Sequence, residues 1–299
     1  MKHTLKITLF LVLIFFAAQI VGLGVTNQYI DHNKTAEKGA VVFKELPYNI
    51  TRPEVNQSQS FIWIFAAIIV GTLLVFLLIR FRKPKVWRIW FLLSVVVTMA
   101  FSLSAFMDYV LATFLSIIFG LWKIYRPNIY VHNLTEIFIY GGLAAIFVPM
   151  LNIFSAFALL ILISAYDIYA VWKSGHMVEL AKFQTKSKIF AGLMIPYKRL
   201  PKPRKGEKLV VKKVRTAVLG GGDIGFPLIF SGVVMKGLML KVPVFQGFLL
   251  SAIISVCAAI ALLILLLKAK KDKFYPAMPF ISLGCLVGYL IVQAILLVL

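Results

Sequence analysis

Two aspartates lie inside segments whose other residues are apolar enough to cross a membrane. Asp167 lies in AFALLILISAYDIYAVW, and Asp223 lies in TAVLGGGDIGFPLIFSGVV. A carboxylate at bilayer depth costs roughly 3 kcal/mol or more, so such residues are rare and mark functional sites. Two neighbouring carboxylates cannot both ionise easily, and we expect this pair to share one proton near neutral pH. The ionised group can take a proton from water while the protonated group donates to a carbonyl oxygen, which is the acid–base chemistry of peptide hydrolysis.

The positions of the two aspartates along their helices predict that they meet. Asp167 comes six residues before Lys173, so it lies about 9 Å inside its helix end. Asp223 comes eight residues after Arg215, which corresponds to a depth of about 12 Å in a helix that enters from the same side. Antiparallel helices then bring both carboxylates to nearly one level. Because the pair would titrate as a unit, neither is assigned as the acid or the base.

The composition places these aspartates in a membrane protein. The 299 residues have a mean hydropathy of +0.92, with 61% hydrophobic and only 14% charged residues, which excludes a soluble globular core. Runs of about 18 or more apolar residues indicate spanning helices. We therefore expect an all-α polytopic membrane protein with nine transmembrane helices, at approximately 5–25, 61–81, 88–107, 109–125, 130–151, 153–173, 216–236, 243–267 and 277–298.

The net charge of +21 sits in alternate links between these runs, at 80–88, 173–215 and 268–273. The positive-inside rule makes these links cytoplasmic, so the amino terminus is expected inside and the carboxyl terminus outside. Basic links contact the anionic headgroups of a lipid bilayer. We expect no nucleic-acid partner, because no aromatic-basic module of the kind that RNA-binding proteins use is visible.

The expected organisation has three parts. Residues 1–173 form a bundle of six spans with the first aspartate, 174–215 form a basic cytoplasmic loop, and 216–299 form three spans with the second aspartate. Within the loop, 208–214 are apolar and β-branched, which suggests a short exposed strand. We hypothesise that this strand pairs with an unwound substrate.

Other polar residues near the spans have simpler interpretations. Asp108 falls in a tight turn that water can reach, and Glu136 is expected to snorkel or to pair with a basic group. Cys257 and Cys285 each lie in an apolar run and are expected to be small buried thiols. Their spacing matches no zinc site, and we expect no metal, nucleotide or other cofactor.

Three short motifs, in order along the last four spans, resemble those of the presenilin and signal peptide peptidase family of intramembrane aspartyl proteases. They are Tyr166-Asp167 within SAYD, Gly220-Gly221-Gly222-Asp223 as a G-x-G-D, and Pro276-Ala277-Met278-Pro279 at the start of the last span. The resemblance covers spans six to nine well and the first five mainly by count and topology. It implies a protease that cuts the transmembrane helices of single-span membrane proteins.

The resemblance also assigns roles to individual residues. It makes Asp167 and Asp223 the catalytic pair, with Tyr166 beside them. It places substrate binding on the glycines and on the loop that closes over the site, namely Gly220, Gly221, Gly222, Pro276, Ala277 and Met278.

Four features of the sequence refine this resemblance. The family pattern has leucine where this chain has Met278, so side-chain preference could differ while the fold is kept. Pro279 and the expected cytoplasmic amino terminus resemble features of the presenilin branch of the family. The long acidic insertion of animal presenilins is missing, which argues against self-cleavage. The chain is most similar to an archaeal presenilin-type homologue, so we expect it in a prokaryotic cell membrane, where it could form a homo-oligomer.

Two other functions are compatible with intramembrane carboxylates. A secondary transporter or cation leak channel also uses such groups, together with helices interrupted by glycine and proline. Against it, the sequence shows no repeated half with a second broken helix. A catalytically dead scaffold is the third alternative.

Overall fold

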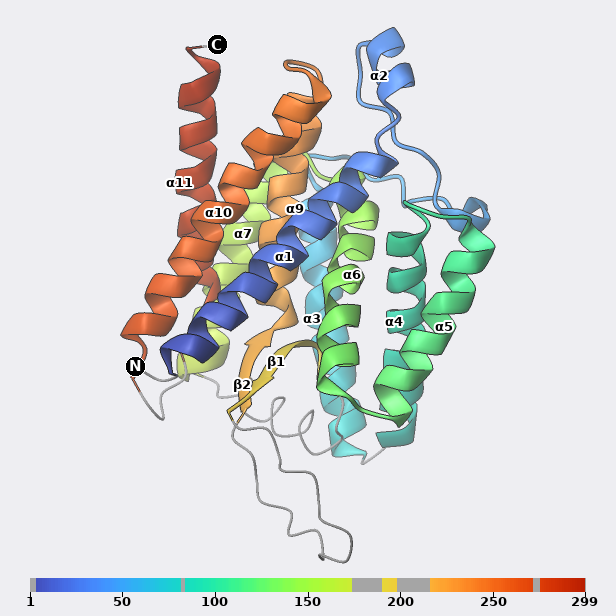
Figure 1. Ribbon diagram of the computed structural model, residues 1–299, viewed down its shortest axis with the longest axis vertical. Helices are drawn as coiled ribbons and strands as arrows, with labels where there is room; N and C mark the ends of the chain where they lie inside the picture. The colour runs from blue at the N-terminus through green and yellow to red at the C-terminus, as the bar shows by residue number, and fades with distance from the viewer. Residues whose placement is uncertain (1–3, 82–83, 174–189, 198–215, 271–274, 299) are drawn as a thin grey trace, which may run out of the picture.

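The structure, a computed structural model, describes residues 4–81, 84–173, 190–197, 216–270 and 275–298 (Figure 1). The first half contains α1 (Leu5–Tyr29), α2 (His32–Lys38), the 3-10 turn η1 (Pro47–Asn49), α3 (Ser60–Arg80), α4 (Pro84–Leu103), α5 (Tyr109–Tyr125), α6 (Ile129–Phe147) and the turn η2 (Val148–Met150). The second half contains α7 (Ile153–Ile168), the π-helical turn η3 (Tyr169–Lys173), β1 (Gly192–Pro196), β2 (Thr216–Gly220), α9 (Gly221–Leu238), α10 (Val244–Lys268) and α11 (Met278–Leu296).

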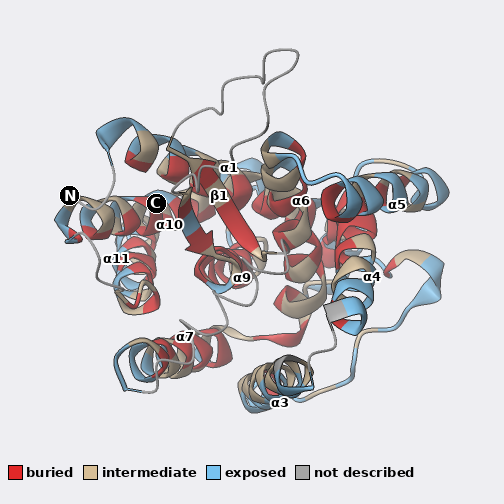
Figure 2. Ribbon diagram, turned by 90° about the horizontal axis from the view of Figure 1, so that it is seen from below, coloured by how far each residue is buried: buried red, intermediate tan, exposed pale blue. Residues whose placement is uncertain are grey.

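Helix α9 occupies the centre of the bundle and is surrounded by α1, α6, α7, α10 and α11 (Figure 2). Its residues are buried on nearly every face, which is unusual for a helix and requires an apolar sequence all round. An aromatic cluster joins α9 to its neighbours, because the ring of Phe157 lies 4.7 Å from that of Phe230 and 5.2 Å from that of Tyr289. The second aspartate therefore belongs to the most enclosed helix of the molecule.

Helices α10 and α11 pack closely through glycine. A Cβ atom added to Gly288 would lie 2.7 Å from the Cα of Ile254, and one added to Gly284 would lie 2.7 Å from the backbone oxygen of Cys257. Small residues allow helix backbones in a membrane to approach in this way. This contact fixes the position of α11, whose first residue, Met278, bonds to Asp167.

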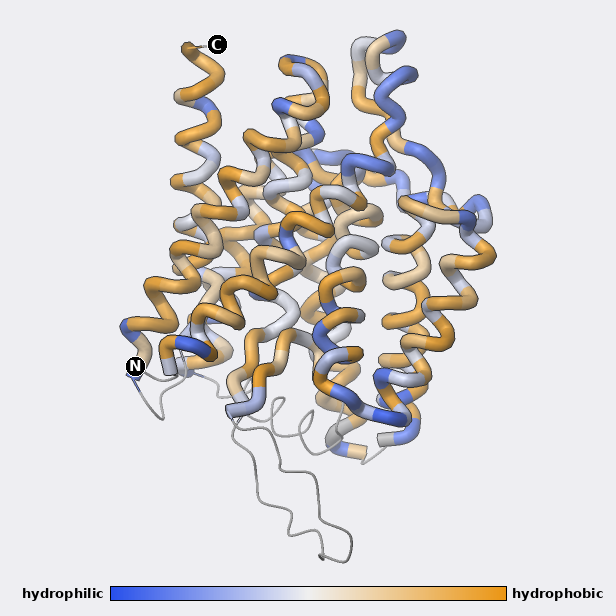
Figure 3. Tube along the Cα trace, viewed as in Figure 1, coloured by the Kyte–Doolittle hydropathy of each residue, from blue (hydrophilic) through white to orange (hydrophobic). Residues whose placement is uncertain are grey.

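The helices have the lengths and the surface of a multi-pass membrane protein. Among the described residues, seven helices are long and apolar enough to cross a bilayer, and α5 is a shorter apolar helix. Large apolar side chains such as Leu13, Leu73 and Ile161 point out of the bundle. Hydrophobic residues fill the middle of the structure, whereas hydrophilic residues gather toward its two ends (Figure 3).

The seventh predicted span, 216–236, is wrong at its start, because 216–220 form strand β2 and helix α9 begins only at Gly221. Strand β2 pairs antiparallel with β1, from Gly192 opposite Gly220 to Pro196 opposite Thr216. A short apolar run has no periodicity that separates strand from helix, which explains the error. The all-α expectation thus misses a small sheet. The strand predicted at 208–214 lies outside the described residues.

Candidate active site

Asp167 lies in the last turn of α7, just before the π-helical turn, and its side chain meets the start of α11. Its Oδ2 accepts a hydrogen bond of 3.0 Å from the backbone N–H of Met278, and the backbone of Ala277 also bonds to this carboxyl group. The first N–H groups of a helix have no partner within the helix, and they favour an anion. Its Oδ1 is buried and has no hydrogen-bond partner among the described residues.

Asp223 lies in the first turn of α9 and is also buried. Its carboxyl group accepts a hydrogen bond from the backbone of Gly220, the residue that precedes the helix. The sequence placed Asp223 eight residues into a helix, but it is the third residue of α9, because the preceding residues are extended in β2. Each aspartate is therefore bound by the amino-terminal end of a helix.

The two aspartates are close enough for their charges to interact. This proximity follows from the packing of α7 against α9, which antiparallel helices of similar length allow. Neither carboxyl group is exposed by more than 8%. The structure thus brings together the two buried acids that the sequence singled out.

The three glycines before Asp223 have no side chains, which leaves space for the side chains of Asp223, Tyr140 and Phe226. A Cβ atom on Gly220 would lie 3.3 Å from Oδ2 of Asp223. A Cβ on Gly221 would lie only 2.8 Å from the hydroxyl oxygen of Tyr140, and one on Gly222 would lie 3.3 Å from the ring of Phe226. Gly221 is the most constrained of the three, since Tyr140 is fully enclosed in the core.

A cavity of about 920 Å³ reaches Asp223 and is lined mainly by apolar residues of α3, α4, α6, α9 and α10. Four of the predicted substrate-binding residues line it, namely Gly220, Gly221, Gly222 and Ala277. Pro276 and Met278 are buried next to Ala277. The ring of Tyr166 instead lies edge-on against Phe65 of α3, at 6.4 Å between centroids.

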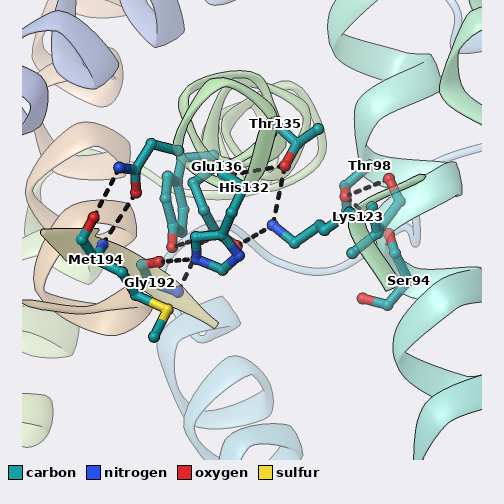
Figure 4. Close-up of polar contacts among 11 residues, drawn as sticks. Ser94, Thr98, Lys123, His132, Thr135, Glu136, Gly192 and Met194 are labelled. Atoms are coloured by element: carbon teal, nitrogen blue, oxygen red, sulfur yellow. Dashed lines mark hydrogen bonds and ion pairs between the residues drawn. The ribbon is translucent and has the colours of Figure 1, made fainter. Parts of the chain in front are cut away.

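Sequence reasoning missed most of a polar network beside this cavity (Figure 4). Glu136 pairs with the buried Lys123 at 2.5 Å, which confirms that Glu136 has a basic partner. Its other oxygen accepts hydrogen bonds from the hydroxyl of Tyr140 and, at 3.0 Å, from the backbone N–H of Gly192. The one available signal was the Lys123 charge at the end of the preceding span. Nothing in the sequence pointed to Tyr140.

Asp108 and the two cysteines, which the sequence also singled out, do not line this cavity. Asp108 caps α5 by accepting from the backbone N–H groups of Val110 and Leu111. Cys285 is buried, Cys257 is partly buried, and both are free thiols. Among the described residues, no group of three or more His, Cys, Asp or Glu side chains could hold a metal ion.

The chain is similar to known proteins in both sequence and fold. The family model described as signal-peptide peptidase, presenilin aspartyl protease matches residues 40–298. Among curated proteins, none matches the chain significantly. Two solved structures of a presenilin family intramembrane aspartate protease, in space groups C222 and P2, have TM-scores of 0.62 and 0.60. Each is 16% identical in sequence and covers 96% of this chain, and the alignments include 99% and 97% of those chains.

At 16% identity, the two structures show a shared fold, while the family match itself spans most of the chain. The motifs that suggested the family all lie within the matched residues. The chain belongs to the signal-peptide peptidase and presenilin family, and it is an intramembrane aspartyl protease.

Proposed function

We propose that Asp167 and Asp223 are the catalytic pair and that they hydrolyse peptide bonds within the transmembrane segments of single-span membrane proteins. The observation that carries this assignment is a pair of buried carboxyl groups whose charges interact, one of which, that of Asp223, lines an apolar cavity. Hydrogen bonds from the starts of α9 and α11 hold both groups in place. Such preorganisation is what acid–base catalysis requires.

In this mechanism the two carboxyl groups share one proton. The ionised carboxylate removes a proton from water as the water oxygen bonds to the peptide carbon, and the other carboxyl group donates its proton to the carbonyl oxygen. The tetrahedral intermediate then breaks its C–N bond as a proton passes to the amide nitrogen. Oδ1 of Asp167, which has no partner among the described residues, is the oxygen that is free to bind the water.

The substrate must unwind before this reaction, because a helical carbonyl is already hydrogen-bonded and shielded. We propose that the unwound segment pairs with strand β2, next to Asp223. Val218 of this strand is 45% exposed and lines the cavity. Our sequence-based hypothesis placed the pairing strand at 208–214. Those residues lie outside the described structure, whereas 216–220 form a strand next to Asp223. Addition of a strand to an exposed edge is a common mode of peptide recognition.

We further propose that the chain crosses the membrane nine times, with its amino terminus in the cytoplasm. The support is that α5 and α9 complete a set of nine with the seven longer apolar helices. The two ends of the chain also lie at opposite ends of the bundle (Figure 1). A prokaryotic cell membrane and a homo-oligomer stay predictions. One chain supplies both aspartates, so the proposed chemistry needs no second copy.

The test uses the full chain in proteoliposomes with a single-span reporter. Asp167→Asn and Asp223→Asn preserve side-chain shape and should each lower the cleavage rate at least about a hundredfold. Asp108→Asn is the matched control, because asparagine also caps helices well, and its rate should be unchanged. Full activity in either catalytic-site variant would contradict the assignment. Cation flux without cleavage would favour the transporter alternative.

The pairing of substrate with β2 has its own test. A proline in place of Val218 removes one backbone N–H while keeping an extended conformation, which edge strands tolerate. Val218→Pro should therefore abolish cleavage without loss of expression, whereas Val218→Ala should keep most activity. Equal cleavage by both variants would eliminate the proposed pairing.

A further inference from the structure

The outer edge of β1 is covered by polar side chains of helix α6 (Figure 4). Asn133 donates a hydrogen bond of 2.8 Å to the carbonyl oxygen of Met194 and accepts one of 3.0 Å from its backbone N–H. A neighbouring strand would make the same pair of contacts. His132 donates through Nε2 to the carbonyl oxygen of Gly192 at 2.7 Å, and Glu136 accepts from the N–H of Gly192.

These contacts determine which edge of the hairpin is open. In an antiparallel pair, the backbone N–H and C=O groups of successive residues point alternately toward the partner strand and away from it, and two directly opposite residues behave alike. The backbone groups of Gly192 and Met194 point to α6, away from β2. Those of the opposite residues, Gly220 and Val218, therefore point away from β1. Gly220 then bonds to Asp223, which agrees with this geometry. Val218 therefore directs its N–H and carbonyl to the outer edge of β2, and Val218 is also one of the residues that line the cavity.

The α6 residues are themselves held in place by a buried ion pair. Lys123, at the end of α5, contacts Glu136 at 2.5 Å and donates to Thr135 at 3.0 Å. Lys123 and Glu136 are only 4% and 1% exposed. Tyr140 donates to the second oxygen of Glu136. A carboxylate with three donors around it has little freedom to turn, so its contact with Gly192 is rigid.

A two-stranded hairpin is at best marginally stable by itself. We propose that His132, Asn133 and Glu136 replace a third strand: they assemble the β1–β2 hairpin before substrate arrives and leave the backbone groups of Val218 in β2 open among the described residues. They are positioning residues and touch neither aspartate in this role. The inference deepens the proposed function and rests on it, because the open edge is the one proposed to bind substrate.

Preassembly has a measurable consequence for substrate binding. If the hairpin is already formed, binding does not have to supply the free energy that orders it. Loss of the α6 contacts should therefore weaken binding more than it slows the chemical step. It should also loosen the hairpin in the absence of any substrate.

The experiment compares two asparagines of the same helix in the full chain, reconstituted in nanodiscs. Asn133→Leu removes both contacts to Met194. Asn128→Leu is the matched control, because Asn128 caps the start of α6 by accepting from Tyr130 at 2.9 Å and forms no hydrogen bond to the hairpin among the described residues. Hydrogen exchange of the amides at 192–196 should accelerate at least about tenfold in Asn133→Leu and stay unchanged in Asn128→Leu. Asn133→Gln keeps the amide group, with its donor and its acceptor, and should recover part of the protection.

Cleavage of the single-span reporter supplies the second measurement. In Asn133→Leu the KM should rise at least about fivefold while kcat changes less than twofold, a split that general destabilisation does not produce. Unchanged hydrogen exchange overturns the inference. Faster exchange with an unchanged KM overturns it as well, since the hairpin then contributes nothing to binding. The exchange measurement can be made in the Asp167→Asn background, so failure of the proposed protease mechanism is recognised separately.

Discussion

The backbone N–H of Met278 donates a hydrogen bond of 3.0 Å to Oδ2 of Asp167. This contact joins residues far apart in the sequence, and it places the first turn of α11 against the last turn of α7. The bond comes from the backbone, so the identity of residue 278 matters through packing. The contact also explains why the aspartate site depends on α11, a helix without an acidic residue.

The first prediction concerns the side chain of Met278, which is 2% exposed. Met278→Leu conserves volume and should change the free energy of unfolding by less than about 1.5 kcal/mol, with cleavage retained. Met278→Ala leaves a void and should cost about 2–5 kcal/mol. Thermal unfolding of the purified variants measures the difference. Equal stability of the two variants would show that the side chain does not pack as described.

The second prediction concerns Gly221, whose added Cβ would lie 2.8 Å from the hydroxyl oxygen of Tyr140. Gly221→Ala should lower the cleavage rate strongly, because either Tyr140 or the start of α9 has to move. Gly237→Ala, later in the same helix, is the control, since its Cβ would meet the side chain of Ile153 at an ordinary contact distance of 3.7 Å. Tyr140→Phe in the Gly221→Ala background should recover part of the lost activity. No recovery would mean that the hydroxyl is not the obstacle.

A third prediction follows from the burial of Lys123 and Glu136 as an ion pair. Lys123→Met leaves an uncompensated buried carboxylate and should destabilise the protein by about 3–5 kcal/mol. Adding Glu136→Gln removes that charge and should restore part of the stability. Lys85→Met is the control at an exposed site, with an expected change within about 0.5 kcal/mol. The midpoint of thermal unfolding measures the stability of the single, double and control variants. If Lys123→Met is as stable as the unmodified protein, Lys123 and Glu136 do not form a buried ion pair.

The fourth prediction concerns the packing that supports α11. Gly288→Ala forces apart α10 and α11, because the new Cβ would lie 2.7 Å from the Cα of Ile254. We expect a cost of about 1–3 kcal/mol and a reduced cleavage rate, since α11 carries the N–H that binds Asp167. Gly71→Ala in α3 meets no atom within 4 Å and should leave both stability and cleavage intact. If the two variants have equal stability and equal cleavage rates, the packing of α11 against α10 does not determine activity.

Much of the helical architecture could be predicted from the sequence, because apolar runs are local features. Apart from the short helix α2 and the start of the seventh span, the helices of the structure fall on the predicted spans to within a few residues. Asp167 and Asp223 could be singled out for the same reason, since a charge within an apolar run is visible without any alignment.

The sequence by itself determined which residues enter the membrane and which two acids stand among them, because hydrophobicity and charge are properties of each segment. Only the tertiary structure decided how those segments meet. The pairing of 192–196 with 216–220, the contacts of Asn133 and Glu136 with β1, and the bond from Met278 to Asp167 all join distant parts of the chain. Such contacts depend on how helices pack and on which backbone groups are left unpaired, and no local pattern records either.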